Sequence, residues 1–387
     1  MRKYGVLILA MLVFSLRLSA EGQVALPTDL HAYLLVVEPG NDLTSAYGHA
    51  AFRLTCPSKS LDNCFTYGME DTFANNIRFF TGTGQGRFVA VKSAAYIDNY
   101  KAQGRGMMSY KLNLTLEQIR NLWKTLDREV AHGSHRHYDY MHTNCSSMCA
   151  YMLELSLGAD SIRYRDVDEE LTGTYRTSIH AISDNRPWTD LFWQTLVGAE
   201  GDGNGQLWEK LSPKYIARVW AKAELTDSTG QARPLLAGSG QQVLSHRLPP
   251  AGTWFTPVVC MSLLLAVALS LALAERRRGR VRAARLFDIG LACCYTALGI
   301  VMVYTSFFSE LSSFSMNRLA IVYNPLPALL WCCFRKRGGY RRLYPLYATV
   351  LVAFMAIAPW MTEVGIAHLL FMLTLLVRVL VWNRQRV

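Results

Sequence analysis

The last third of the chain restricts its fold most, because it consists of long apolar runs. Residues 255–274 form an uncharged stretch that is long enough to cross a bilayer as a helix. Similar stretches follow at 286–308, 317–334, 343–360 and 364–382. We therefore predict an all-α membrane domain of five transmembrane helices over residues 254–387.

The basic residues predict how this domain is oriented. Arg and Lys are frequent at 276–285 and 335–342, whereas the loops at 309–315 and 361–363 carry none. Basic loops stay in the cytoplasm, so the chain before residue 255 is predicted to lie outside it. Residues 1–20 agree, because Arg2, Lys3 and an apolar stretch are typical of a secretory signal peptide.

The net charge of +11 also comes from this part of the chain. Residues 251–387 carry 15 Lys and Arg against 4 Asp and Glu, while residues 1–250 carry 25 of each kind. The outer part has no basic run, so we predict no nucleic-acid partner.

Two arginines and one proline-containing run stand out in the membrane segments. Arg318 and Arg378 lie near predicted span ends, where snorkelling to lipid head groups is the simplest interpretation, with a phosphate contact for Arg318 as the alternative. Asn324-Pro325-Leu326-Pro327 interrupts the third span and predicts a kink or a break.

The outer part, residues 21–222, mixes strand and helix patterns and predicts an α+β domain. Strands are expected at 32–38 and 107–114, and a hairpin with arms at 50–54 and 64–67. Thr115 and Gln118 match a capping box before a helix at 116–130. Residues 223–253 are rich in Gly, Ser, Pro and Gln and are predicted to be a linker to the first span.

The cysteines outside the membrane segments form two pairs. Cys56 and Cys64 flank a short polar loop, and a disulfide across the hairpin is possible in an oxidising compartment. Cys145 and Cys149 lie one helical turn apart, where disulfide geometry is poor.

Cys145 has the sequence context of a nucleophile. Asn144 is a good N-cap, which places Cys145 in the first turn of a helix, where the partial positive charge lowers a thiol pKa. His49, on an early predicted strand, is a suitable general base. The simpler interpretation is a buried small Cys and a structural His, and we assign Cys149 to the core.

Four histidines precede Cys145, namely His132, His135, His137 and His142. Their spacing matches no standard zinc pattern, so a solvated loop is favoured over a metal site. We expect no metal and no cofactor.

Several short motifs together resemble one family. They are Tyr47-Gly48-His49-Ala50-Ala51-Phe52-Arg53, Phe65-Thr66-Tyr67-Gly68, Tyr138-Asp139-Tyr140 with Asn144-Cys145-Ser146, Thr174-Tyr175-Arg176, and Arg186-Pro187-Trp188. This set resembles the periplasmic domain of the Lnb-type lipoprotein N-acyltransferases. The order of His before Cys is similar to permuted papain-like (NlpC-type) thiol acyltransferases.

The resemblance implies a reaction and a place. Cys145 would take an acyl chain from a phospholipid as a thioester, with His49 as base, and the amine of a diacylglyceryl-cysteine lipoprotein would accept the chain. The location implied is a bacterial inner membrane, with the catalytic domain in the periplasm. Thr66 stands where the family commonly has Asn, and Thr66, Tyr67 and Asp139 remain open as the third catalytic member.

Two other functions fit parts of the sequence. A papain-like cell-wall peptidase (peptidoglycan hydrolase) uses the same Cys and His pair but seldom needs five membrane helices. A non-enzymatic membrane sensor would leave Cys145 and His49 without a role.

Overall fold

The computed structural model describes residues 27–384 apart from 71, 159–160, 165–172, 184–185, 204–211, 227–229, 250–251, 280, 335–342 and 363. The predicted signal peptide and the second basic loop lie outside the described residues.

An antiparallel sheet of seven strands forms the centre of the outer domain, in the order β10-β5-β1-β2-β3-β4-β6. Its strands are β1 His31–Val37, β2 His49–Cys56, β3 Leu61–Gly68, β4 Gln85–Lys92, β5 Met107–Lys111, β6 Arg136–His137 and β10 Gln241–Leu244. The predicted hairpin is present as β2 and β3, with Ala51 opposite Thr66. The register matters for the site, because it places residues of β3 beside the first residues of β2.

The predicted linker is partly folded onto the domain. A smaller sheet consists of β7 Ile162–Tyr164, β8 Ala223–Thr226 and β9 Ala232–Pro234, and β10 pairs with β5. The strands β8, β9 and β10 therefore belong to the outer domain rather than to a free tether, because β8 pairs with β7, β9 with β8 and β10 with β5.

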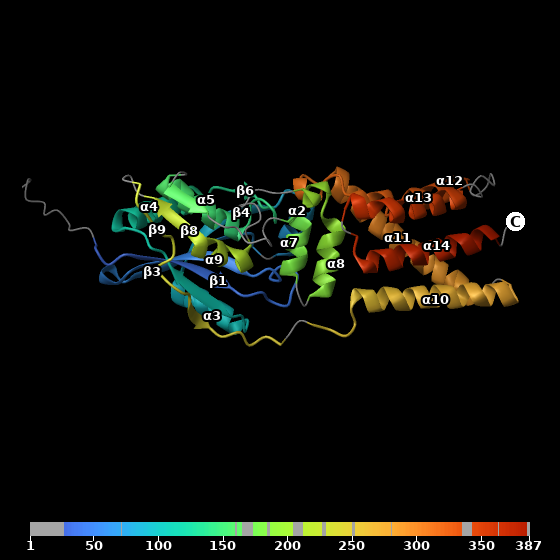
Figure 1. Cartoon of the computed structure of the whole chain (residues 1–387), viewed down its shortest axis with the longest axis horizontal. Coiled ribbons are helices and arrows are strands. Elements are labelled where there is room, and N and C mark those ends of the chain that lie inside the picture. Colours follow the sequence, from blue (N-terminus) through green and yellow to red (C-terminus); the bar gives the residue numbers. More distant parts are fainter. Residues whose placement is uncertain are drawn as a thin grey trace, which may run out of the picture.

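Helices cover both faces of the main sheet. On one face lie α4 Leu116–His132 and α5 Cys145–Leu157, and on the other lies α3 Ser93–Ala102 (Figure 1). Phe52, Phe65 and Leu122 belong to the core on the first face, and Tyr96 and Tyr100 to the smaller core on the second. The α+β prediction is confirmed for this domain.

The sequence signals for helix starts are also confirmed. Thr115 and Gln118 form the predicted capping box at α4, which ends at Gly133 with φ +58°. Asn144 is the N-cap of α5.

Cys56 and Cys64, for which the sequence left a disulfide open, do not form one, since both thiols are free. The hairpin register pairs Cys64 with Arg53, three residues before Cys56. Side chains alternate across a strand, so the two cysteines point to opposite faces of the sheet, and each belongs to a different core.

Four further helices of the outer domain lie within its described residues, namely α2 Phe73–Thr81, α7 Tyr175–Ile182, α8 Pro187–Leu196 and α9 Pro213–Lys222. α2, α7 and α8 stand between the sheet and the membrane helices (Figure 1). The site described below lies at this junction.

The membrane domain is helical, with α10 Pro257–Arg278, α11 Arg282–Phe307, α12 Leu326–Phe334, α13 Leu343–Ile357 and α14 Ile366–Arg384. Within the described ranges, three helical segments are long and apolar enough to cross a bilayer: α10, α11 and Leu343–Trp360. A shorter apolar helix covers Ile366–Val381.

The predicted third span at 317–334 is not one continuous helix. A 3-10 turn at Arg318–Ile321 is followed by a break before α12. The break lies inside the protein, where the Tyr295 hydroxyl donates to the Val322 carbonyl at 2.7 Å. Irregular backbone at membrane depth is stable only with such internal partners.

Arg378 does not snorkel to head groups, so this interpretation is wrong. Its side chain is buried and forms ion pairs with Asp288 at 2.6 Å and Glu275 at 2.9 Å. Arg318 pairs with Asp202 of the outer domain at 2.6 Å, instead of extending freely toward lipid. Asp202 also binds Arg176 at 2.8 Å, so this carboxylate connects the two domains.

Candidate active site

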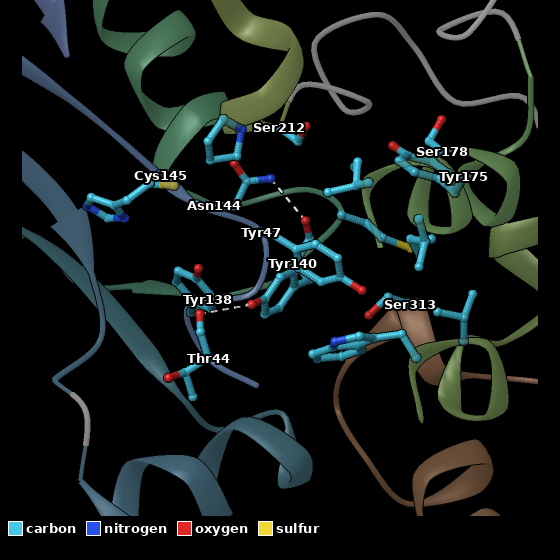
Figure 2. Close-up of a pocket in the computed structure, with 18 of the residues that line it drawn as sticks. Thr44, Tyr47, Tyr138, Tyr140, Asn144, Cys145, Tyr175, Ser178, Ser212 and Ser313 are labelled. Atoms are coloured by element: carbon cyan, nitrogen blue, oxygen red, sulfur yellow. Dashed lines mark hydrogen bonds between the residues drawn. The ribbon is translucent and has the colours of Figure 1, made fainter. Parts of the chain in front are cut away.

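Cys145 and His49 line the same pocket, at the edge of the outer domain that faces the membrane helices. The pocket has an empty volume of about 830 Å³, including the part open to solvent. Figure 2 shows Cys145 and Asn144 on one side of it and Ser313 on the other. The two residues that the sequence singled out, nearly a hundred positions apart, are thus brought together by the fold.

Cys145 is the first residue of α5, and Asn144 fixes this helix start. The side-chain oxygen of Asn144 accepts the backbone N–H groups of Ser146 at 2.9 Å and Ser147 at 3.0 Å. The Ser147 hydroxyl accepts the N–H of Asn144 in return, which completes a capping box. The local sequence alone therefore places the thiol at the positive end of the helix dipole.

His49 begins β2 directly after a glycine that the backbone requires. Gly48 has φ +82°, and a Cβ there would lie 2.6 Å from the carbonyl oxygen of Val37. This turn presents the His49 ring to the pocket. The ring stacks on Tyr100 of α3, with 6.3 Å between the ring centroids.

The charge states of the pair follow from burial and from a nearby arginine. Burial and the charge of Arg105 lower the pKa of His49 to about 4. Burial raises the pKa of the Cys145 thiol, and the Ala50 backbone N–H acts against this rise. Near neutral pH the resting site therefore holds a neutral imidazole and a protonated thiol.

Arg105 was not singled out from the sequence, because nothing in its neighbourhood marks it. Its guanidinium lies over the Tyr100 ring at 4.9 Å, and its Nε donates to the Glu38 carbonyl at 2.8 Å. It is buried, and among the described residues it forms no salt bridge. The positive charge of Arg105 therefore lies next to the Tyr100 ring, on which the His49 ring stacks.

The structure separates the three candidates for a third member. The Thr66 hydroxyl lies 2.6 Å from Nε2 of His49. Tyr67, the next residue on β3, points to the opposite face, and its hydroxyl donates to the Arg136 carbonyl at 3.4 Å. Asp139 accepts the N–H of Met141 at 2.6 Å and so stabilises a turn. Of the three, Thr66 contacts His49.

Aromatic and aliphatic side chains form most of the pocket wall. Tyr140 and Trp193 are in contact, with ring centroids 4.5 Å apart, and Tyr47 packs edge-on against Tyr140 at 5.2 Å. Further apolar lining comes from Met141, Ile179, Ile182 and Val197. Such a surface suits an apolar ligand rather than a charged one.

The membrane domain also contributes to the pocket. Ser313 and Phe314, in the 3-10 turn Ser312–Phe314 that follows α11, belong to its lining. Phe314 is buried and packs edge-on against Phe79 of α2 at 5.9 Å. Only the absence of basic residues in the loop 309–315, which predicted its outer location, could have pointed to this role.

The histidines before Cys145 do not gather into one site. The Nδ1 atoms of His132 and His137 lie within hydrogen-bond distance of the carbonyls of Arg128 and Gly82, at 2.7 and 2.9 Å. His142 lies 3.0 Å from Glu200. Each of these three thus has a separate partner, and no group of three metal-ligating side chains occurs in the part of the chain that the structure describes.

The comparisons with known proteins identify the class of protein. Residues 23–181 match the family model of the Lnb N-terminal periplasmic domain, and residues 250–386 match that of the Lnb transmembrane domain. The chain is therefore a membrane protein with a periplasmic domain. It belongs to the Lnb-type lipoprotein N-acyltransferase family, whose role is related to lipoprotein N-acylation. No curated protein and no solved structure matches the chain.

Proposed function

We propose that this protein transfers an acyl chain from a phospholipid to the N-terminal amine of diacylglyceryl-cysteine lipoproteins, through a thioester on Cys145. The observation that carries the proposal is the pocket itself. It contains a thiol at a capped helix start and a buried imidazole, and it has apolar walls from both domains. A peptidoglycan hydrolase would need polar groups for its substrate instead.

The first half-reaction forms the thioester. The Thr66 hydroxyl is hydrogen-bonded to Nε2 of His49. Nδ1 is therefore the nitrogen that takes the proton of the Cys145 thiol. The sulfur then attacks the ester carbonyl of the phospholipid, and the negative oxygen of the tetrahedral intermediate faces the N–H of Cys145. The C–O bond breaks, His49 returns the proton to the glycerol oxygen, and a lysophospholipid leaves.

The second half-reaction forms the amide. The neutral amine of the diacylglyceryl-cysteine attacks the thioester carbonyl, and His49 takes a proton from the attacking nitrogen. The C–S bond breaks, and the sulfur recovers this proton. Both lipids have their head groups at the outer surface of the membrane, and the pocket is lined by residues of the outer domain together with Ser313 and Phe314 of the membrane domain.

The direct test is mass spectrometry of lipoprotein N-termini from cells with the intact chain, without it, and with Cys145→Ser. We expect an amide-linked acyl chain only with the intact chain. A free amine in all three samples, or an amide that persists with Cys145→Ser, would contradict the proposal.

A further inference from the structure

One hydrogen bond links the membrane domain to the segment that carries the nucleophile. The Ser313 hydroxyl donates to Oδ2 of Asp139 at 2.9 Å, and both side chains are buried. Ser313 follows α11 of the membrane domain, whereas Asp139 lies six residues before Cys145. A buried carboxylate without partners is costly, so this contact constrains both segments.

The other oxygen of Asp139 organises the turn that leads to Cys145. Oδ1 accepts the N–H groups of Met141 at 2.6 Å and His142 at 3.2 Å. The backbone groups of Asp139 and Thr143 pair in both directions, at 3.0 and 3.2 Å. Asn144, the cap of α5, follows at once. A hydrogen-bonded path therefore runs from Ser313 through Asp139 to Thr143, and Thr143 is covalently joined to the residue that caps α5.

The backbone of the Ser313 loop is itself held in place. Gly198 donates to the Ser313 carbonyl at 2.8 Å, and Ala199 donates to the Ser315 carbonyl at 3.0 Å. A Cβ at Gly198 would lie 1.9 Å from the Ser315 oxygen, so the approach of the two backbones requires a glycine there. Ser313 thus has little freedom to move away from Asp139.

We propose that Ser313 of the membrane domain is a positioning residue for Cys145, acting through Asp139, and that the active site is complete only when the two domains are docked. This inference rests on the proposed role of Cys145. Asp139 then acts through the turn and not as the third member of a triad. A displacement of a catalytic group by about 1 Å can cost about 100-fold in rate, so loss of this link should affect turnover.

The test compares two serines of the same loop in the full-length protein. Ser309 also donates a hydrogen bond to the outer domain, to the Phe80 carbonyl at 2.9 Å, but this bond does not reach the Asp139 turn. We expect S313A to lower acyl transfer by about 10- to 100-fold. We expect S309A to stay within about twofold of the native protein.

A second readout follows the thiol itself. Alkylation of Cys145 by iodoacetamide, measured by peptide mass spectrometry, should change in rate with S313A and stay constant with S309A. S313A added to D139A should cause no further loss, because the link is already broken. Equal effects of S313A and S309A on transfer and on alkylation would overturn the proposal.

If S313A does not fold, a comparison of S313T with S313V tests the proposal instead. The threonine and valine side chains have nearly the same shape, but only threonine has the hydroxyl. S313T should exceed S313V in transfer per folded molecule, and equal rates would overturn the proposal. Alkylation reports on the position of the thiol even if the protein transfers no acyl chain. Failure of this inference is therefore distinguishable from failure of the proposed function.

Discussion

The Nε2 atom of His49 lies 2.6 Å from the hydroxyl oxygen of Thr66, on the neighbouring strand. The contact follows from the pairing of β2 with β3, in which Thr66 stands opposite Ala51. A hydroxyl at this distance restrains the plane of the ring. Under the proposed function, Nδ1 is then the atom that exchanges a proton with the thiol, and Thr66 is the proposed third member of the site.

Thr66→Val should lower the rate of thioester formation by about 10- to 100-fold, because the ring loses the partner that orients it. Thr66→Ser keeps the hydroxyl and should retain most of the rate. The measurement is the burst of lysophospholipid release in a single turnover. Equal rates for the valine and serine variants would show that this contact does not matter for the reaction.

Cys145→Ser and His49→Ala should each lower acyl transfer by about 1,000-fold or more, since the proposed function makes them a nucleophile and its base, which act as a unit. Cys149→Ser is the matched control. Cys149 is on the same helix, one turn later, and fully buried in the core. It should keep most of the activity, as measured by lipoprotein mass spectrometry.

The pH dependence of thioester formation should lack a step near the ordinary histidine pKa. Because burial and Arg105 lower the pKa of His49 to about 4, the imidazole remains neutral and able to accept a proton above that pH. The rate should therefore fall only as the pH approaches about 4, and not between about 6 and 7. A half-maximal rate near pH 6.5 would contradict the assigned environment of His49.

The same shift affects stability. The unfolded chain binds a proton at His49 near the ordinary pKa of 6.5 and the folded chain only near 4. Between these pH values the unfolded chain binds more protons at His49 than the folded chain does. The free energy of unfolding is therefore highest above pH 6.5, as far as His49 is concerned, and it decreases as the pH falls toward 4. Thermal unfolding of His49→Gln should be less sensitive to pH in this window than that of the native protein.

Asn144→Ala should lower the free energy of unfolding by about 1 kcal/mol, because two N–H groups of α5 lose their acceptor. Activity should fall as well, since the thiol depends on this helix start. Asn144→Asp keeps the acceptor oxygen and should restore the stability in a thermal unfolding assay. A stable but inactive Asn144→Asp would instead point to a role for the amide N–H, which donates to the Tyr140 carbonyl at 3.0 Å.

Arg378→Met should destabilise the membrane domain by about 3–5 kcal/mol, because it leaves the buried carboxylates of Asp288 and Glu275 without their cation. The triple variant with Asp288→Asn and Glu275→Gln should recover part of this loss. Thermal unfolding in detergent measures the stability of both variants. If Arg378→Met left the stability unchanged, the carboxylates of Asp288 and Glu275 would be stabilised without the arginine.

Local chemistry predicted much of what lies near the nucleophile. The capping residues before α4 and α5, the hairpin of β2 and β3, and the membrane helices each depend on neighbours within a few positions. The absence of a disulfide between Cys56 and Cys64 depends on register: residues at an odd offset across a hairpin face opposite sides of the sheet. The predicted break at Asn324-Pro325-Leu326-Pro327 is present, and it separates the 3-10 turn at Arg318–Ile321 from α12.

The sequence by itself determined that Cys145 starts a capped helix, that His49 starts a strand after a glycine, and that the last third is apolar enough for a membrane. Only the tertiary structure decided that Thr66 contacts His49, that Arg105 lies over the Tyr100 ring on which His49 stacks, and that Ser313 reaches Asp139. Helix caps and hydrophobic runs depend on residues that are close in the sequence, so the sequence alone reveals them. The contacts of Thr66 with His49 and of Ser313 with Asp139 join residues 17 and 174 positions apart, and packing alone brings such segments together.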